Sequence, residues 1–264
     1  MTAKPFKWPA AVLGLAMVLS LGAGSSTGYA QDKGEKKEKI NKAEEAAYKN
    51  VLAAQNGDPS ARIQVGEDFV AKFPMSRYVG GVYGMLTTSH YVTGNTDKMF
   101  STGAKALELN PDNVDVLALL AMAIPRRVKS TTPDGAQQLK NAETYGHHAI
   151  ELIPNMVKPA AMDDATFEKQ KNDELAMSHS GLGLLDLNRG KFEDAKTELD
   201  QAVKLASSPD PVDYYLLGKA DAQGSYYNDA AAAFEKCAAA GPLMAQCKAG
   251  ADSAKQDAAT KLSR

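Results

Sequence analysis

The sequence predicts an all-α fold built from a repeated helix-turn-helix pattern. The strongest evidence lies between His179 and Cys237, where one pattern occurs twice at an offset of 35 residues. The first copy has Leu182-Gly183, Gly190, Phe192, Ala195, Leu199 and Ala202, and the second has Leu217-Gly218, Ser225, Tyr227, Ala230, Phe234 and Cys237. A fixed period with small residues at matching positions is typical of helical repeat arrays. The composition agrees, because alanine is abundant and only 7% of the residues are aromatic.

The first thirty residues have the three parts of a secretory signal peptide. Lys4 and Lys7 precede an apolar run from Ala10 to Ala23, and the segment ends in Gly28-Tyr29-Ala30. We therefore expect residues 1–30 to be cleaved off after Ala30 and the protein to be exported, either periplasmic or secreted. The alternative is an uncleaved anchor. Because the apolar run is shorter than the roughly 20 residues that span a bilayer, we expect no stable membrane insertion after cleavage.

The rest of the chain divides at helix-ending and helix-starting residues. Residues 31–42 are dense in charge and are interpreted as a solvated linker. Asn56-Gly57-Asp58-Pro59 is typical of the junctions that follow, since it joins a helix-ending glycine to an Asp-Pro helix start. The repeat array is predicted over residues 43–242, with repeats at about 43–76, 80–113, 114–157, 176–209 and 211–244. A last helix over 243–264, apolar on one face and charged on the other, is expected to cap the array.

The third repeat is longer than the others. We assign its extra residues to a loop between Pro125 and Gly135, because insertions in repeat proteins usually map to loops. Arg126, Arg127 and Lys129 on this insertion are candidates for contact with an acidic partner, and a solvated loop is the alternative.

Residues 155–175 do not fit the repeat period. Within them, residues 163–175 are predicted to form a polar helix, which would lengthen the first helix of the fourth repeat.

The repeats resemble tetratricopeptide repeats (TPRs), which have a period of about 34 residues and mix small and large apolar positions on two antiparallel helices. The matches are the residues quoted above, together with Tyr214 and Pro242. The resemblance implies a right-handed superhelical solenoid of about five repeats. In this reading Gly183 and Gly218 let the two helices of a repeat approach, Ala195 and Ala230 face these glycines, and Leu199 and Phe234 fill the space beside them. The earlier repeats depart from the pattern at Gly66, Gly103, Gly146, Thr87 and Ala121.

The resemblance also implies a concave surface, lined by the first helix of each repeat, that binds a peptide. On this chain the lining would include Gly84, Thr88, Tyr91, Ala118, Met122, Ser180, Leu184, Tyr215 and Lys219. The family's ladder of Lys and Asn residues, which clamps a terminal carboxylate, is not reproduced at these positions. An apolar, tyrosine-bearing groove formed by Tyr91, Met122, Leu184, Tyr215 and Lys219 would suit an extended or helical segment.

The sequence offers no catalytic, cofactor-binding or metal-binding residues. Gly181-Leu182-Gly183 lacks the further glycine and the strand of a phosphate loop. Ser178, His179 and Ser180 lie in a helix, where adjacent residues do not face each other. His147 and His148 are adjacent and cannot address one metal from a helix face. We therefore expect neither an enzyme nor a cofactor, and the formal charge of −2 gives no reason to expect nucleic acid as a partner.

Cys237 and Cys247 are the only cysteines. In an exported chain such a pair is expected to form a disulfide, which would pin the capping helix to the array. Two buried thiols are the alternative.

These features together predict a non-catalytic, exported scaffold that resembles TPR proteins and binds a protein or peptide. The alternative function is a structural or assembly subunit of a cell-envelope complex.

Overall fold

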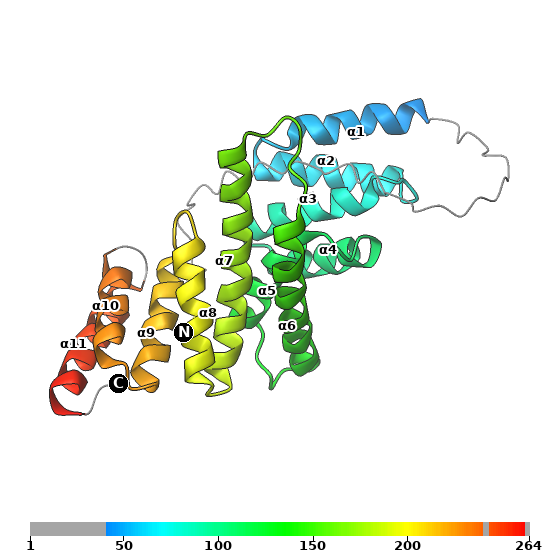
Figure 1. Ribbon diagram of the computed structural model, residues 1–264. Coiled ribbons are helices and arrows are strands. Elements are labelled where there is room, and N and C mark those ends of the chain that lie inside the picture. The colour runs from blue at the N-terminus through cyan, green and yellow to red at the C-terminus, as the bar shows by residue number, and fades with distance from the viewer. Residues whose placement is uncertain (1–40, 240–242, 262–264) are drawn as a thin grey trace, which may run out of the picture. The chain divides into compact units, whose positions relative to one another are not determined.

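The computed structural model describes residues 41–239 and 243–261, and within them every regular element is helical (Figure 1). The elements are α1 (Lys42–Ala54), α2 (Pro59–Lys72), α3 (Val79–Val92), α4 (Thr96–Leu109), α5 (Val114–Arg127), α6 (Gly135–Leu152), the 3₁₀ turn η1 (Ile153–Asn155), α7 (Asp164–Asn188), α8 (Phe192–Leu205), α9 (Pro211–Gln223), α10 (Tyr227–Ala238) and α11 (Met244–Thr260). The predicted all-α repeat fold is confirmed. The predicted signal peptide and nearly all of the charged linker lie outside the described residues.

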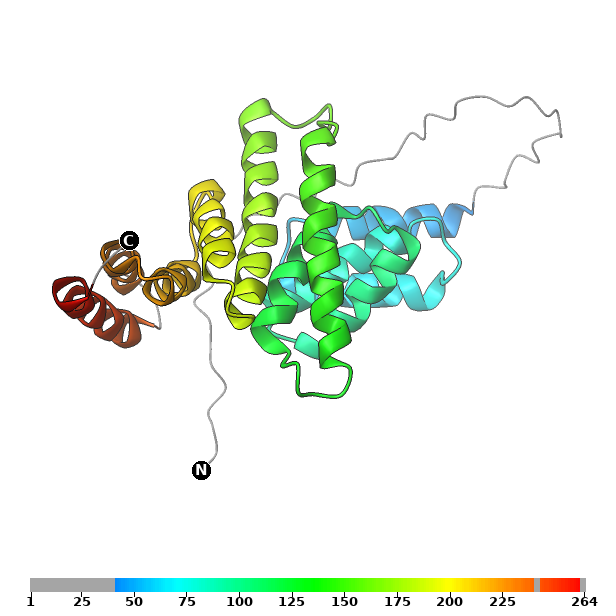
Figure 2. The same cartoon turned by 60° about the horizontal axis from the view of Figure 1, so that its bottom comes forward.

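The described helices form two compact units, α1 to α4 and α5 to α11. In the first unit, α2 packs on α1 and α3, and α3 packs on α4, around a core that includes Val51, Phe69 and Leu86. In the second unit, each helix from α7 to α11 packs on the next in chain order, as Figure 2 shows. Two helix pairs thus occupy the first unit, and three pairs with a terminal helix occupy the second.

Asparagine and aspartate side chains determine where most of the helices begin. In six helices the N-cap side chain accepts a hydrogen bond from a backbone N–H of the first turn, at Asn41, Asp58, Asn95, Asn113, Asp163 and Asp210. These side chains satisfy donors that the helix itself cannot pair. Pro59 and Pro211 follow two of the caps at the first helical position, where a missing N–H has no cost.

The turns inside three helix pairs share one backbone conformation. Gly94, Gly190 and Ser225 stand at corresponding positions, with φ values of 73°, 75° and 68°. This left-handed region favours glycine, because a β-carbon is crowded there. The sequence match between Gly190 and Ser225 therefore reflects one turn geometry, which a serine adopts in the last pair.

Close helix packing explains the best-matched glycines. A β-carbon at Gly183 would lie 2.6 Å from Leu199 Cγ, and one at Gly218 would lie 2.8 Å from Phe234 Cδ1. The predicted role of both glycines is therefore confirmed. The glycines that depart from the family pattern act similarly: a β-carbon at Gly66 would lie 2.8 Å from Leu86, and one at Gly146 would lie 3.1 Å from Leu182. At these two contacts the small residue lies on the second helix of a pair and the leucine on the first helix of the next.

The helix α7 is continuous over 25 residues, so the segment before residue 176 extends it at its N-terminal end. At 1.5 Å per residue it is about 37 Å long, against about 21 Å for its partner α8. Phe167 of the extension is buried, and Asp173 accepts hydrogen bonds from the backbone N–H and the hydroxyl of Ser207 at 2.7 and 2.9 Å. The extension is thus an integral part of the C-terminal unit.

The helix α5 continues further than the sequence predicted. It runs through Pro125 to Arg127, so the connection to α6 comprises only residues 128–134. Pro125 has no N–H, so the carbonyl of Ala121 does not receive its usual helical hydrogen bond. This carbonyl lies against Gly181 of α7, where a β-carbon would lie only 2.2 Å from its oxygen. The backbones of α5 and α7 are therefore in close contact.

Candidate functional site

Three of the predicted groove residues gather on α7 and α9. Leu184 of α7 and Tyr215 of α9 are half-buried and pack against the same apolar cluster, which includes Leu187 and Leu216. Lys219, one turn after Tyr215, places its ammonium nitrogen 5.8 Å from the centre of the tyrosine ring. We call Leu184, Tyr215 and Lys219 the α7–α9 surface. It combines apolar area with one positive charge, on two helices that pack together.

Other predicted groove residues are not available for binding. Met122 is only 6% exposed, because the whole stretch of α5 from Val116 to Pro125, including Ala118, is buried. Gly84 is also buried, and the hydroxyl of Ser180 donates to Asp213 at 2.6 Å. The prediction was therefore wrong for Met122, since α5 packs tightly on α6 and α7 and leaves this side chain inside the unit. Tyr91 is half-buried on α3, within the N-terminal unit.

Arg126 is a structural residue, and its assignment to a partner-contacting loop was wrong. It lies in the last turn of α5, and its side chain is 12% exposed. Its guanidinium donates to Asp210 Oδ2 at 2.8 Å, to Ser180 Oγ at 2.8 Å and to Asp213 Oδ1 at 2.6 Å. These hydrogen bonds join α5 and α7 to the start of α9, so Arg126 stabilises the packing of three helices within the C-terminal unit.

Burial dominates the electrostatics at Asp213 and raises the pKa of its carboxyl, while Arg126 and the Ser180 hydroxyl oppose that shift. The two other basic residues of the predicted insertion, Arg127 and Lys129, have exposed side chains at and just after the end of α5. Of the three basic residues, only Arg127 and Lys129 have the exposed side chains that the predicted contact with a partner requires.

The two cysteines are joined by a disulfide between α10 and α11, with α-carbons 5.8 Å apart. Both residues are fully buried. Phe234 of α10 packs against Ala251 and Ala254 of α11 in the same region. The terminal helix is therefore held by apolar packing as well as by a covalent link.

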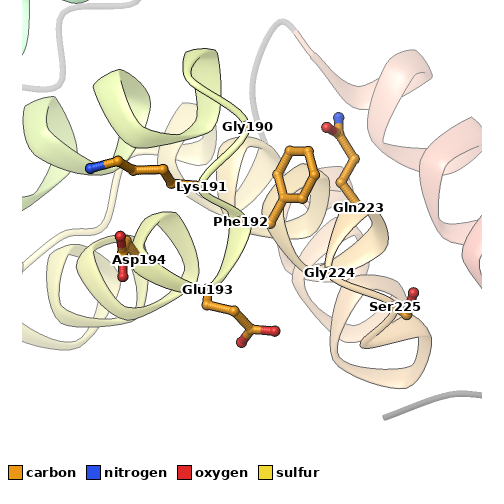
Figure 3. Close-up of a pocket in the computed structure, with 8 residues that line it drawn as sticks. All are labelled: Gly190, Lys191, Phe192, Glu193, Asp194, Gln223, Gly224 and Ser225. Carbon is orange, nitrogen blue, oxygen red and sulfur yellow. The ribbon is translucent and has the colours of Figure 1, made fainter.

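A shallow hollow of about 370 Å³ lies between the α7–α8 turn and the α9–α10 turn (Figure 3). Its lining residues are Gly190, Lys191, Phe192, Glu193, Asp194, Gln223, Gly224 and Ser225. Gly190 and Ser225 are the left-handed residues of corresponding turns in successive helix pairs, so the hollow follows from stacking one turn on the next. None of the predicted site residues lines it.

Comparisons with known proteins bear on the fold. No family model matches the chain, and no curated protein matches it. Among solved structures, PilW, a widely conserved type IV pilus biogenesis factor, is 13% identical, with 82% of this chain and 91% of that one covered and a TM-score of 0.51. A thermophilic TPR protein of Thermus thermophilus is 16% identical, with 81% and 99% covered and a TM-score of 0.48. A tetratricopeptide repeat protein from Parabacteroides merdae is 13% identical, with 81% and 100% covered and a TM-score of 0.38.

The chain has the tetratricopeptide-repeat fold. The helix pairs and their glycine contacts agree with this assignment, and identities this low establish the fold alone.

The TPR fold brings together polar residues that the sequence analysis missed. Lys196 of α8 lies 2.8 Å from Asp221, 3.2 Å from Asp229 and 3.5 Å from Asp200. Burial raises the pKa of Asp221 to about 6 despite the opposing effect of Lys196. Burial also acts to lower the pKa of Lys196, but the three carboxylates together outweigh it and raise that pKa. Three polar contacts join residues 33 positions apart, namely Lys196–Asp229, Ser180–Asp213 and Glu193–Tyr226. This separation is two residues shorter than the 35-residue sequence offset, so a search for polar pairs within two residues of that offset would have found them.

The described part of the chain holds no group of three or more His, Cys, Asp and Glu side chains arranged to bind a metal ion. His148 instead lies 2.7 Å from Asp112, and His179 lies 2.7 Å from Glu198 of α8. Across the same residues, no helix is both long enough and apolar enough to cross a membrane.

Proposed function

We propose that this chain is an exported TPR scaffold that binds a protein or peptide partner and catalyses no reaction. The observation that carries the proposal is the α7–α9 surface, where Leu184, Tyr215 and Lys219 lie half-buried on adjacent first helices. Half-buried aromatic and apolar residues on a rigid helical support provide contact area at a low cost in conformational entropy. Such an arrangement suits recognition better than chemistry.

The chemistry of this surface defines the partner. An apolar side chain of the partner would pack on Leu184 and Tyr215, and a carboxylate would pair with the Lys219 ammonium. A partner segment with an acidic residue next to an apolar anchor meets both requirements, in an extended or a helical form.

Export rests on the amino-terminal sequence, with its basic start, apolar run and Gly28-Tyr29-Ala30 ending. The disulfide between Cys237 and Cys247 supports it, since disulfides persist in oxidising compartments such as the periplasm. A second candidate function is assembly within a cell-envelope complex. PilW, which shares the fold, is described as a pilus biogenesis factor, and this motivates the alternative.

Crosslinking in the native cell envelope, followed by capture of the mature form, tests both functions. We expect a heterologous partner to be recovered with the wild type and largely lost with Lys219→Glu. Lys236→Glu is the matched control, because Lys236 also lies over a tyrosine of α9, 5.4 Å from the ring of Tyr214, but outside the α7–α9 surface. Equal recovery with Lys219→Glu and Lys236→Glu would refute the surface. Recovery of self-crosslinked species alone would favour the assembly function.

A further inference from the structure

A buried histidine, His90, lies in the last turn of α3 in the N-terminal unit. Its side chain is 2% exposed, and among the described residues neither of its ring nitrogens has a hydrogen-bond partner. A neutral imidazole carries one N–H donor and one acceptor nitrogen, so two polar groups are buried here without compensation. The ring is therefore held by packing alone, and a second proton on it would place a charge in the interior of the unit.

The surroundings of the ring do not compensate for such a charge. The helix α3 packs on α2 and α4, and the charged groups described near the ring on these helices are Glu67 and Lys98. Glu67 Oε1 lies 3.8 Å from Nε2 of His90 but 2.6 Å from the ammonium nitrogen of Lys98, so this carboxylate is already paired. The backbone carbonyl of His90 accepts from the N–H of Asn95 and is also occupied. A protonated His90 would thus be a buried cation near a second cation, Lys98.

We propose that His90 is an acid-sensitive contact: protonation of its ring separates α3 from α2 and α4 and opens the N-terminal unit. A buried, unpaired cation is strongly disfavoured, so the folded unit resists a proton that the unfolded chain accepts. In agreement, burial, followed by the Lys98 ammonium, holds the pKa of His90 below its ordinary value of 6.5, while Glu67 opposes that shift. Stability from His90 is therefore complete above about pH 6.5 and is lost as the pH falls through the lowered pKa.

The C-terminal unit contains buried groups with the opposite dependence on pH. Burial, followed by the Asp115 carboxylate, raises the pKa of Glu174 to about 10, and burial raises the pKa of Asp221 to about 6. The folded unit keeps these protons where the unfolded chain releases them, so these two carboxyls stabilise it further as the pH falls from about 7 to about 5. Mild acid should therefore open the N-terminal unit selectively. The α7–α9 surface lies in the C-terminal unit, so acid opening is independent of partner binding there.

Hydrogen exchange of the full mature chain, followed by mass spectrometry at about pH 7 and about pH 5 and corrected for the intrinsic exchange rate, tests the proposal. The opening equilibrium constant of the N-terminal unit should gain up to about tenfold per pH unit below about 6.5. We expect peptides of α2, α3 and α4 to open at least about fivefold more at the lower pH, and peptides of α7 and α9 to open no more than at the higher pH. A gain below about twofold in α2 to α4, or an equal gain in both units, would overturn the proposal.

His90→Leu replaces the ring by an apolar side chain of similar size and should abolish the gain, and His90→Gln provides the same test if that variant does not fold. His148→Gln is the matched control and should retain the gain, because it removes a histidine that is 35% exposed and lies 2.7 Å from Asp112. Equal gains in His90→Leu and the wild type would refute the role of His90. Titration of the ring protons by NMR provides a second readout in the wild type, where a midpoint for His90 at or above 6.5 would contradict the proposal.

Discussion

Replacing Gly181 with alanine should disrupt the contact between α5 and α7. A β-carbon at this position would lie 2.2 Å from the oxygen and 2.5 Å from the carbonyl carbon of Ala121. These are backbone atoms and cannot rotate away, so the two helices must separate. Overpacking of this kind costs about 3 kcal/mol or more, against a gain of at most about 1 kcal/mol from helix propensity. We expect Tm to fall by about 4–12 °C.

Alanine substitutions at two other glycines provide the comparison for this prediction. Gly183→Ala meets the side chain of Leu199, which can repack, so we expect a loss of only about 1 kcal/mol. Gly80→Ala meets Leu109 Cβ at an ordinary 3.4 Å and should be neutral or slightly stabilising. Urea denaturation followed by circular dichroism measures all three. A loss in Gly181→Ala no larger than that in Gly183→Ala would show that the α5–α7 contact is not tight.

Four further results are expected. Cys247→Ser should lower stability by about 2–3 kcal/mol and increase hydrogen exchange in α11, and two free thiols in the native protein by non-reducing mass analysis would contradict the disulfide. Arg126→Met should cost about 3–5 kcal/mol in urea denaturation because it leaves Asp213 buried without its cation, and adding Asp213→Asn should recover part of that loss. Stability from Glu174 is complete below about pH 4.5 and is lost as the pH rises toward 10, because burial and the nearby Asp115 raise its pKa and the folded state keeps a proton that the unfolded chain releases. Glu174→Gln should therefore remove a slope of up to about 1.4 kcal/mol per pH unit from urea denaturation measured across this range. The exported form should show tyrosine fluorescence alone, since Trp8 is the only tryptophan and lies within the predicted signal peptide.

The sequence predicts those features of the fold that depend on residues close together in the chain or one repeat apart. The Asn and Asp caps, the turn glycines and the small residues at helix contacts act over a few positions or at a fixed period, so they can be recognised in one dimension. Asp58-Pro59 predicts the start of α2, and the repeat predicts close helix approach at Gly183 and Gly218, although the nearest side chains there are Leu199 and Phe234 rather than the expected Ala195 and Ala230.

The contacts that escaped prediction join residues far apart in the chain. The sequence predicts a loop at Arg126 because Pro125 normally ends a helix, yet a proline near the end of a helix removes only one hydrogen bond and α5 continues to Arg127. The partner of Arg126, Asp213, lies 87 residues further on. The resemblance places Met122 in a groove because it predicts helical register, but it does not predict how closely the neighbouring helices pack, and Met122 is buried. Gln170 and Asp115, 55 residues apart, have no spacing that a motif search would find.

The length of α7 limits how this chain can be rearranged by recombination or by design. Repeat proteins often gain, lose or exchange repeats, since each repeat contacts mainly its neighbours. Here a cut at residue 176, where the fourth repeat of the period begins, falls inside α7 and separates Glu174 from the rest of its helix. A shuffled fourth repeat would lose the extension with its buried Phe167, whereas exchange between α8 and α9 breaks no helix. A cut that leaves α7 whole must therefore fall before Asp164, about twelve residues earlier than the repeat period suggests.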